Sequence, residues 1–231
     1  MTGRCRLKAV VRVLESSAYA QVLAVFILII LVKLPVLGEP PVWDTAMGLF
    51  PAALTLAGNG FDLMALLRSP GYLDGGANTH SLSLVTLLTA LVLSFFGSGT
   101  KTFVVLHILH FLVAAVALVN LQRFARGALG ASAAWLLCLA VLLFPLFSVQ
   151  VGYTYMEVPL FLCAVSALRS WDLGKYRMAI LWSALALAVK EAGIIVPATL
   201  AVLTMLENRG LVKRAGRAVW VLIPSAAWLG L

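Results

Sequence analysis

Two charged residues, Lys190 and Glu191, stand side by side in a segment that is otherwise apolar from Met178 to Leu206. A charged side chain at the centre of a bilayer costs about 2.5–3.5 kcal/mol on insertion scales. The segment is therefore either one long helix with a functional pair buried in it, or two short helices that meet at a membrane surface. Lys190 needs a compensating partner, for which the adjacent Glu191 is the nearest candidate. At the tip of a hairpin the two side chains can point apart, and Lys190 could then bind an anion.

Three further residues have side chains suited to acid–base chemistry: Asp44, His80 and Glu157. Asp44 follows Trp43 and opens a predicted short helix, where an aspartate can be an N-cap, a general base or both. Glu157 stands at a predicted helix start, where an acid complements the helix dipole. His80 opens the 81–96 segment, where a lone histidine is usually a cap or a packed polar residue. Each residue thus has a structural explanation beside the functional one.

Histidines and aromatic residues give weaker signals. His107 and His110 are three residues apart and share a helix face. That spacing could suit a metal ion, although the sequence supplies no third ligand. Trp43, Tyr153 and Tyr155 are candidates for binding a sugar or an acceptor, and they could equally be the aromatic residues that commonly lie at membrane interfaces.

The composition is that of a helical integral membrane protein. Of 231 residues, 62% are hydrophobic and 11% are charged, and the mean hydropathy is +1.03. A soluble domain of this length could not bury so much apolar surface. The net charge of +8 comes from basic clusters between apolar runs, so it does not indicate a nucleic-acid partner. The three cysteines suggest neither a disulfide framework nor a zinc site.

The basic residues favour one topology. The 178–206 run would be roughly 43 Å long as one helix, which exceeds the ~30 Å hydrocarbon core. If this run is a hairpin and the short 81–96 run does not cross, 13 of the 17 basic residues face the cytoplasm. That distribution satisfies the positive-inside rule. The apolar runs on which it rests are 18–37, 81–96, 103–121, 131–151, 158–171, 178–206 and 219–231.

The predicted architecture is an all-α integral membrane protein with about six to seven transmembrane helices. Residues 1–17 form a basic cytoplasmic N-terminus, and 18–231 form a single membrane domain whose first helix is not cleaved. A long outer loop, 38–102, carries short interfacial helices between the first and second spans, and a hairpin tip near Lys190 faces the same side. The chain ends inside a new apolar run, which suggests truncation at residue 231.

Five motifs in order resemble the GT-C glycosyltransferases of the protein O-mannosyltransferase and aminoarabinose-transferase kind. The resemblance covers roughly residues 18–206. Two departures are the Ser81-Leu82 pair where that family usually has two prolines, and a glutamate at position 157 where an aspartate is commoner. The motifs are "PPVWDTAMGLFPAALTL", "NTHSLSLVTLLTALVLSFFG", "LVNLQRFARGALGASAAWL", "YTYMEVPLFL" and "LALAVKEAGIIVP".

The resemblance implies an enzyme of the bacterial inner membrane, with its N-terminus in the cytoplasm and its site on the outer face. It would move a sugar from a polyprenyl-phosphate donor to an acceptor hydroxyl on a glycan, lipid or protein, with inversion. Asp44 would be the base and Glu157 would orient the acceptor, or the two would hold Mg or Mn, which some GT-C enzymes use and others do not. Lys190 would bind the donor phosphate, assisted by Arg68 or His80.

Two other classes of protein stay open. One is a transporter or channel half, in which charges within the membrane mark a substrate path and inverted repeats are expected. The other is a non-catalytic membrane subunit. No internal repeat is visible, and six of the nine acidic residues fall on the predicted outer side. Convergence of Asp44, Glu157 and Lys190 on one cavity would favour the enzyme.

Overall fold

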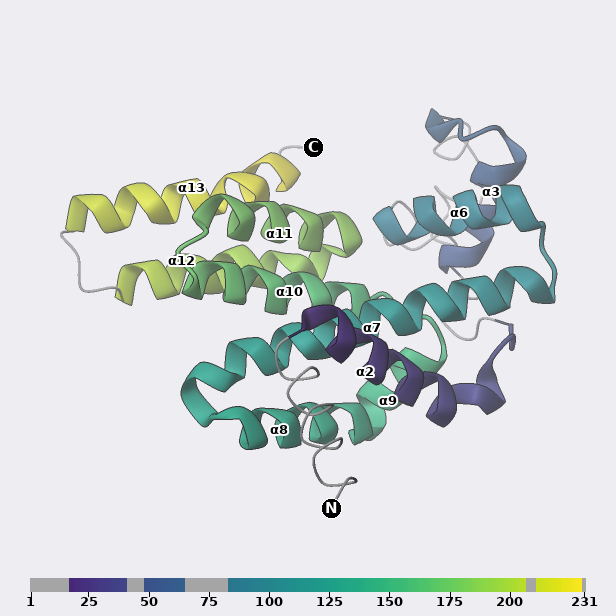
Figure 1. Cartoon of the computed structure of the whole chain (residues 1–231). Coiled ribbons are helices and arrows are strands. Elements are labelled where there is room, and N and C mark those ends of the chain that lie inside the picture. The colour runs from purple at the N-terminus through teal and green to yellow at the C-terminus, as the bar shows by residue number, and fades with distance from the viewer. Residues whose placement is uncertain (1–16, 41–47, 65–82, 207–210, 230–231) are drawn as a thin grey trace, which may run out of the picture.

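The computed structural model describes residues 17–40, 48–64, 83–206 and 211–229, and these residues form helices and no strands (Figure 1). The all-α prediction is therefore confirmed for this part of the chain. Its elements are α2 (Ala18–Lys33), η1 (Leu34–Val36), α3 (Phe50–Gly58), α6 (Leu84–Phe96), α7 (Thr100–Leu129), α8 (Ala131–Leu143), α9 (Pro145–Gly152), α10 (Glu157–Asp172), α11 (Tyr176–Val189), η4 (Glu191–Ile194), α12 (Ile195–Leu206) and α13 (Leu211–Leu229).

The long helix α7 is the centre of the fold. One of its sides packs on α2 and α8, and another packs on α10, which in turn packs on α11. Four of the eleven buried residues of α7 are alanine, and such small side chains let neighbouring helices approach closely. The helix extends beyond the apolar run 103–121 and continues through Arg123 and Arg126 until Gly130, which has a positive φ of 80°.

The apolar run 131–151 forms two helices. α8 and α9 meet at an angle of 66°. Phe144 between them is extended, with ψ at 123°, because the ring of Pro145 disfavours the helical conformation for the residue before it. Pro145 is therefore the residue in the sequence that marks this break.

The 178–206 segment is a hairpin, as the basic residues predicted. α11 has 14 residues and α12 has 12, and α12 runs back beside α11 (Figure 1). The break falls at Lys190, whose φ of −159° and ψ of 145° are extended. α11 packs on α10 and also contacts α6.

The outer segment predicted at 38–102 contains two short helices, α3 and α6. They pack on each other through a small cluster made by Ala52, Ala53, Leu56, Ala90 and Leu93. α6 begins where the Ser83 hydroxyl accepts a hydrogen bond from the Thr86 backbone N–H at 3.1 Å. A second cluster joins α10, α11, α12 and α13, and a third joins α2 and α7 to α8, α9 and α10.

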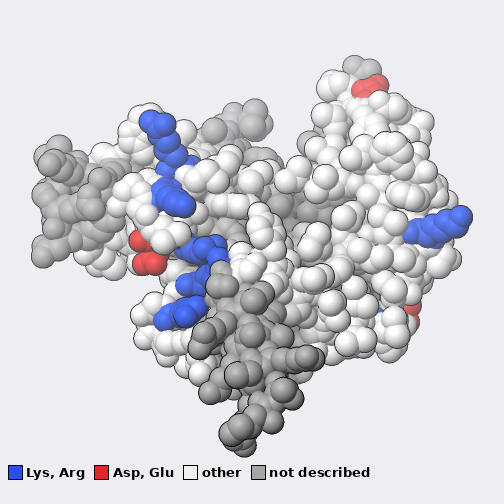
Figure 2. Space-filling view, viewed as in Figure 1, with Lys and Arg blue, Asp and Glu red and all other residues white. Residues whose placement is uncertain are grey.

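Two of the described helices are long and apolar enough to cross a membrane: α2 with η1, and α7. The bent pair α8–α9 makes a third if it counts as one span, and α6, α11 and η4–α12 are shorter apolar helices. The number of spans supported by length and composition is thus two or three, below the predicted six to seven. Figure 2 shows a face that is mostly uncharged, as expected for a protein that contacts lipid.

Candidate functional site

Lys190 and Glu157 form an ion pair across 33 residues of sequence. The distance from Lys190 Nζ to Glu157 Oε1 is 2.5 Å, and the side chains are 21% and 33% exposed. The lysine's partner is Glu157 on α10, a pairing that the sequence did not predict. Two of the predicted site residues, one assigned to catalysis and one to phosphate binding, lie in direct contact.

The hairpin turn positions Lys190. Its backbone N–H donates to the Ala186 carbonyl at 3.1 Å, and its own carbonyl accepts from the Gly193 N–H at 2.8 Å. Gly193 lies so close to the last turns of α11 that an added Cβ would be 2.2 Å from the Ala186 carbonyl oxygen. Only glycine fits at such a separation from a backbone atom. The turn therefore holds Lys190 in its extended conformation by direct contact between backbones.

A tight turn after α9 positions Glu157. Thr154 in this turn has a φ of 57°. A left-handed conformation is rare for a β-branched residue, and such conformations cost about 1–3 kcal/mol. The Tyr155 N–H donates to the Gln150 carbonyl at 3.3 Å, and the next helix begins at Glu157. The carboxylate therefore stands in the first turn of α10, where it complements the positive end of the helix dipole.

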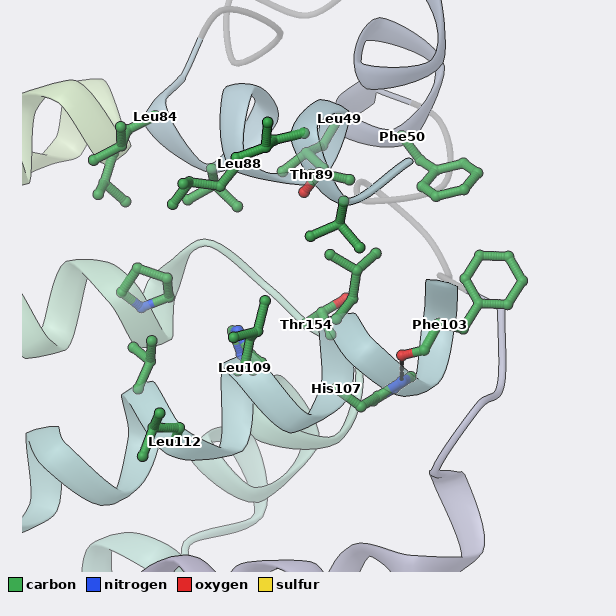
Figure 3. A pocket seen from close by; sticks show the side chains of 18 of the residues that line it. Leu49, Phe50, Leu84, Leu88, Thr89, Phe103, His107, Leu109, Leu112 and Thr154 are labelled. Carbon is green, nitrogen blue, oxygen red and sulfur yellow. Dashed lines mark hydrogen bonds between the residues drawn. The ribbon is translucent and has the colours of Figure 1, made fainter. Parts of the chain in front are cut away.

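An apolar cavity of about 350 Å³ lies between α6 and α7. Figure 3 shows Leu84, Leu88 and Thr89 of α6 on one side, and His107, Leu109 and Leu112 of α7 on the other. Pro159 and Val189 also line the cavity, so the wall includes residues within two positions of Glu157 and of Lys190. The polar groups in the lining come from Glu39, Thr89, His107, His110 and Thr154.

The two histidines serve the local packing of α7 on the turn after α9. His107 Nδ1 lies 2.8 Å from the Phe103 carbonyl oxygen, and its Nε2 lies 3.0 Å from that of Gly152. His110 Nε2 lies 3.2 Å from the Gln150 carbonyl oxygen. A neutral imidazole has one N–H, so each ring can donate to one of these carbonyl oxygens. Within the described ranges no group of three potential metal ligands occurs, so the metal alternative for these histidines has no support.

Four predicted site residues lie outside the described residues: Trp43, Asp44, Arg68 and His80. Tyr153 and Tyr155 flank the strained Thr154 and are half-buried. They stand in the same turn that delivers Glu157, but no described contact joins either ring to the ion pair. The structure therefore brings together Glu157, Lys190 and the tyrosine turn, and it leaves the position of Asp44 a prediction.

Sequence reasoning missed two polar residues near this site. Glu39 follows the first helix and lines the cavity. Lys33, in the last turn of α2, donates from Nζ to the Ser148 hydroxyl at 2.6 Å, and it lies beside Gly152. A lysine at the end of an apolar helix looks like an ordinary interfacial anchor. Only the packing of α2 against α9 shows that it has a specific partner.

No protein-family model, curated protein or solved structure matches the chain.

Proposed function

We propose that the protein is a membrane glycosyltransferase of the GT-C kind that takes its sugar from a polyprenyl-phosphate donor. The observation that carries the proposal is an ion pair between a lysine and a carboxylate whose neighbours in sequence, Val189 and Pro159, line an apolar cavity of about 350 Å³. A lipid phosphate needs these two features next to each other: a cation for its head and an apolar space for its chain. The volume falls at the lower end of the range typical of ligand pockets, about 300–1,000 Å³.

Lys190 can contact a phosphate without losing Glu157. An ammonium group has three N–H donors, and Glu157 takes one of them. The remaining two are available for the oxygens of a leaving phosphate, whose negative charge grows as the bond to the sugar breaks. Glu157 holds the ammonium at the edge of the cavity, and it is in this proposal a positioning residue rather than a base.

The chemical step is a single displacement. The acceptor hydroxyl oxygen bonds to the anomeric carbon of the sugar, the bond from that carbon to the phosphate oxygen breaks, and the lipid phosphate leaves with the electron pair. The hydroxyl proton passes to Asp44, the proposed base, and the anomeric carbon is inverted. Arg68 and His80 are proposed to assist at the phosphate, and Trp43, Tyr153 and Tyr155 to contact the sugar or the acceptor.

A divalent cation shared by Asp44 and Glu157 does not fit the surroundings of Glu157, the one of these two residues that the structure describes. The Glu157 carboxylate is already in contact with the Lys190 ammonium at 2.5 Å, and a metal ion in the same place would meet that positive charge. No step of the proposed reaction is therefore assigned to Mg or Mn.

The proposal includes a topology. The N-terminus lies in the cytoplasm of a bacterium, the chain crosses the inner membrane about six to seven times, and the cavity opens on the outer side. Short arms such as α11 and α12 can cross where neighbouring helices shield them or the bilayer thins. Cysteines placed at exposed Lys101 and at Arg177 would test this: an impermeant reagent should label position 101 in intact cells, and position 177 only after lysis. The reverse pattern would overturn the orientation.

Binding of undecaprenyl phosphate to the full chain in detergent tests the proposed function. We expect Lys190→Gln to weaken binding by about 10- to 100-fold, the equivalent of 1.5–3 kcal/mol for a hydrogen bond to a charged group. Lys101→Gln, at an exposed position, is the matched control and should bind like the wild type. Unchanged affinity in a folded Lys190→Gln variant would remove Lys190 from the site and with it the main support for the proposal.

Transfer itself is tested by Asp44→Asn in the full chain. This variant should bind undecaprenyl phosphate normally and lose transfer from undecaprenyl-phosphate sugars. Binding that depends on Lys190, with transfer that is insensitive to Asp44→Asn, would reduce Asp44 to a helix cap. Binding without transfer in the wild type would favour the non-catalytic subunit, and movement of the lipid across the bilayer would favour the transporter.

A further inference from the structure

A second group of cations lies at the opposite end of α10 from Glu157. Arg169 is in the last turn of α10, and Arg123 is near the end of α7. Glu157 and Arg169 are twelve residues apart on one helix, or about 18 Å along its axis. The arginine group is therefore a site separate from the cavity and the ion pair.

Both guanidinium groups are held by side-chain amides rather than by acids. Arg169 Nη1 donates to Asn120 Oδ1 at 2.7 Å, and Asn120 Nδ2 donates in turn to the Ser166 hydroxyl at 3.0 Å. Arg123 Nε donates to Gln21 Oε1 at 3.0 Å. These contacts connect α2, α7 and α10, so the two arginines are fixed at a junction of three helices.

The two positive charges have no carboxylate partner within the described part of the chain. They lie close enough to repel each other, and Asp172, one turn after Arg169, makes no ion pair with either. Figure 2 shows basic side chains gathered on this side of the face drawn, with a small acidic area beside them. Each guanidinium has five N–H donors, of which one has a partner among the described residues.

We propose that Arg123 and Arg169 bind a phosphate group, and that this group belongs to the head of an anionic phospholipid. The two half-buried guanidinium groups are anchored where α2, α7 and α10 meet, and each has N–H donors without a partner among the described residues, which phosphate oxygens can accept. Basic sites between transmembrane helices commonly hold lipid head groups in this way. The lipid is favoured over a soluble phosphate because the neighbouring surface of α2 exposes Leu23, Ile27 and Leu31, which suit acyl chains. The inference does not depend on the glycosyltransferase activity.

The structural alternative is that these arginines only stabilise the ends of α7 and α10. Cations near helix C-termini do so without any ligand. The two explanations differ in what Asn120→Asp does. A carboxylate at this position would neutralise Arg169 and keep the link between α7 and α10, so it should preserve the fold and abolish phosphate binding.

The experiment measures binding of phosphatidic acid to the full chain in detergent, with phosphatidylcholine as the zwitterionic control lipid. Arg123→Gln, Arg169→Gln and Asn120→Asp should each weaken phosphatidic acid binding at least tenfold, and phosphatidylcholine should bind weakly to all. Exposed Arg126→Gln and Arg177→Gln are the matched controls and should change binding less than twofold. Circular dichroism and a melting curve identify any variant that fails to fold. If an arginine variant fails to fold, the binding measured with Asn120→Asp decides between a phosphate site and a purely structural role.

Inorganic phosphate separates the two sources of the anion. If it binds weakly and displaces phosphatidic acid only at a large excess, the lipid head group is the ligand. If it binds as tightly as the lipid and with the same dependence on Arg123 and Arg169, the site takes a soluble phosphate, and the lipid part of the proposal is wrong. If all four arginine variants lose the same affinity for phosphatidic acid, the lipid is attracted by diffuse surface charge and the proposed site is wrong. If none of them loses affinity, the proposed site is also wrong.

Discussion

The two ends of α10 compensate their charges in different ways. At the start of the helix, Glu157 is paired with a lysine from another segment at 2.5 Å. At its end, Arg169 is held by the neutral amide of Asn120 at 2.7 Å and lies near a second arginine. Both charges have the sign that the helix dipole favours at their positions. The dipole therefore does not explain why one end is neutralised and the other stays positive.

The difference indicates different tasks for the two ends. A partly buried lysine is stabilised when an opposite charge is near, since burial of a single charge is costly. The arginine pair has no carboxylate partner among the residues that the structure describes, so an anion could still bind to it. The first end is thus neutralised by a described residue, and the second is the end for which we propose a ligand.

The turns that precede and follow α10 also differ, in the residue type that adopts a positive φ. Gly174, which follows the helix, has a φ of 70°, and Thr154, which precedes it, has a φ of 57°. Glycine adopts this conformation without strain, whereas threonine does not. The strained residue is the one that lines the cavity. Strain retained next to a cavity is typical of sites where geometry matters more than stability.

The largest expected effect comes from breaking the hairpin that holds Lys190. Gly193→Ala should destabilise the protein by about 3 kcal/mol, because the new Cβ would overlap the backbone of Ala186. Unfolding in detergent, followed by circular dichroism, measures this loss. Gly127→Ala in α7 is the control: nothing lies within 4 Å of its Cβ position, and it should stabilise by about 0.5–1 kcal/mol. Equal behaviour of the two variants would contradict the close contact.

Glu157→Gln replaces the carboxylate partner of Lys190 by a neutral amide, the kind of group that already holds Arg169 at the other end of α10. We expect a loss of about 1.5–2 kcal/mol, below the 3–5 kcal/mol known for fully buried pairs, because both side chains are partly exposed. Adding Lys190→Gln should restore much of the loss, since no unpaired charge is then left. A double variant that loses the sum of both single effects would show that the two residues do not interact.

Sequence patterns were sufficient to predict a helix boundary where nearby residues determine it. The hairpin at Lys190 was predicted from the distribution of the basic residues, and a helix start at Glu157 was predicted where the apolar run 158–171 begins. In α7 the apolar run ends at residue 121 but the helix continues through Arg126, because a charge at a membrane surface ends an apolar run without ending a helix. The break at Phe144 is marked in the sequence by Pro145. The apolar run itself continues across this position, so hydropathy alone does not indicate the break.

The candidate site was predictable in its residues but not in its pairings. Lys190 and Glu157 were identified by charge in apolar surroundings, yet their contact joins residues 33 positions apart and no local rule gives it. The cavity depends on how α6 lies over α7, which a sequence period does not fix. Thr154 gave no signal, since its strain is a property of the folded turn.

A smaller effect is expected at the other end of α10. Asn120→Ala should cost about 1–1.5 kcal/mol, because it removes the amide that joins Arg169 to Ser166. The unfolding measurement used for Glu157 applies here. Asn120→Asp, which keeps the acceptor for Arg169, should cost less than the alanine variant. If alanine and aspartate cost the same, the amide does not hold Arg169 in place.

The smallest effect concerns the turn itself and has the opposite sign. Thr154→Asn should stabilise the protein by about 0.5–1 kcal/mol, since asparagine adopts a left-handed conformation at a lower cost than a β-branched residue. Thr154→Val is the control: it keeps the branched Cβ and the strain, and it should not stabilise. Thermal unfolding of the two variants gives the comparison. If asparagine stabilises the turn and weakens undecaprenyl phosphate binding, the strain serves the cavity. If it stabilises and leaves binding unchanged, the strained turn only sets where α10 begins, and the contrast between Thr154 and Gly174 has no functional meaning.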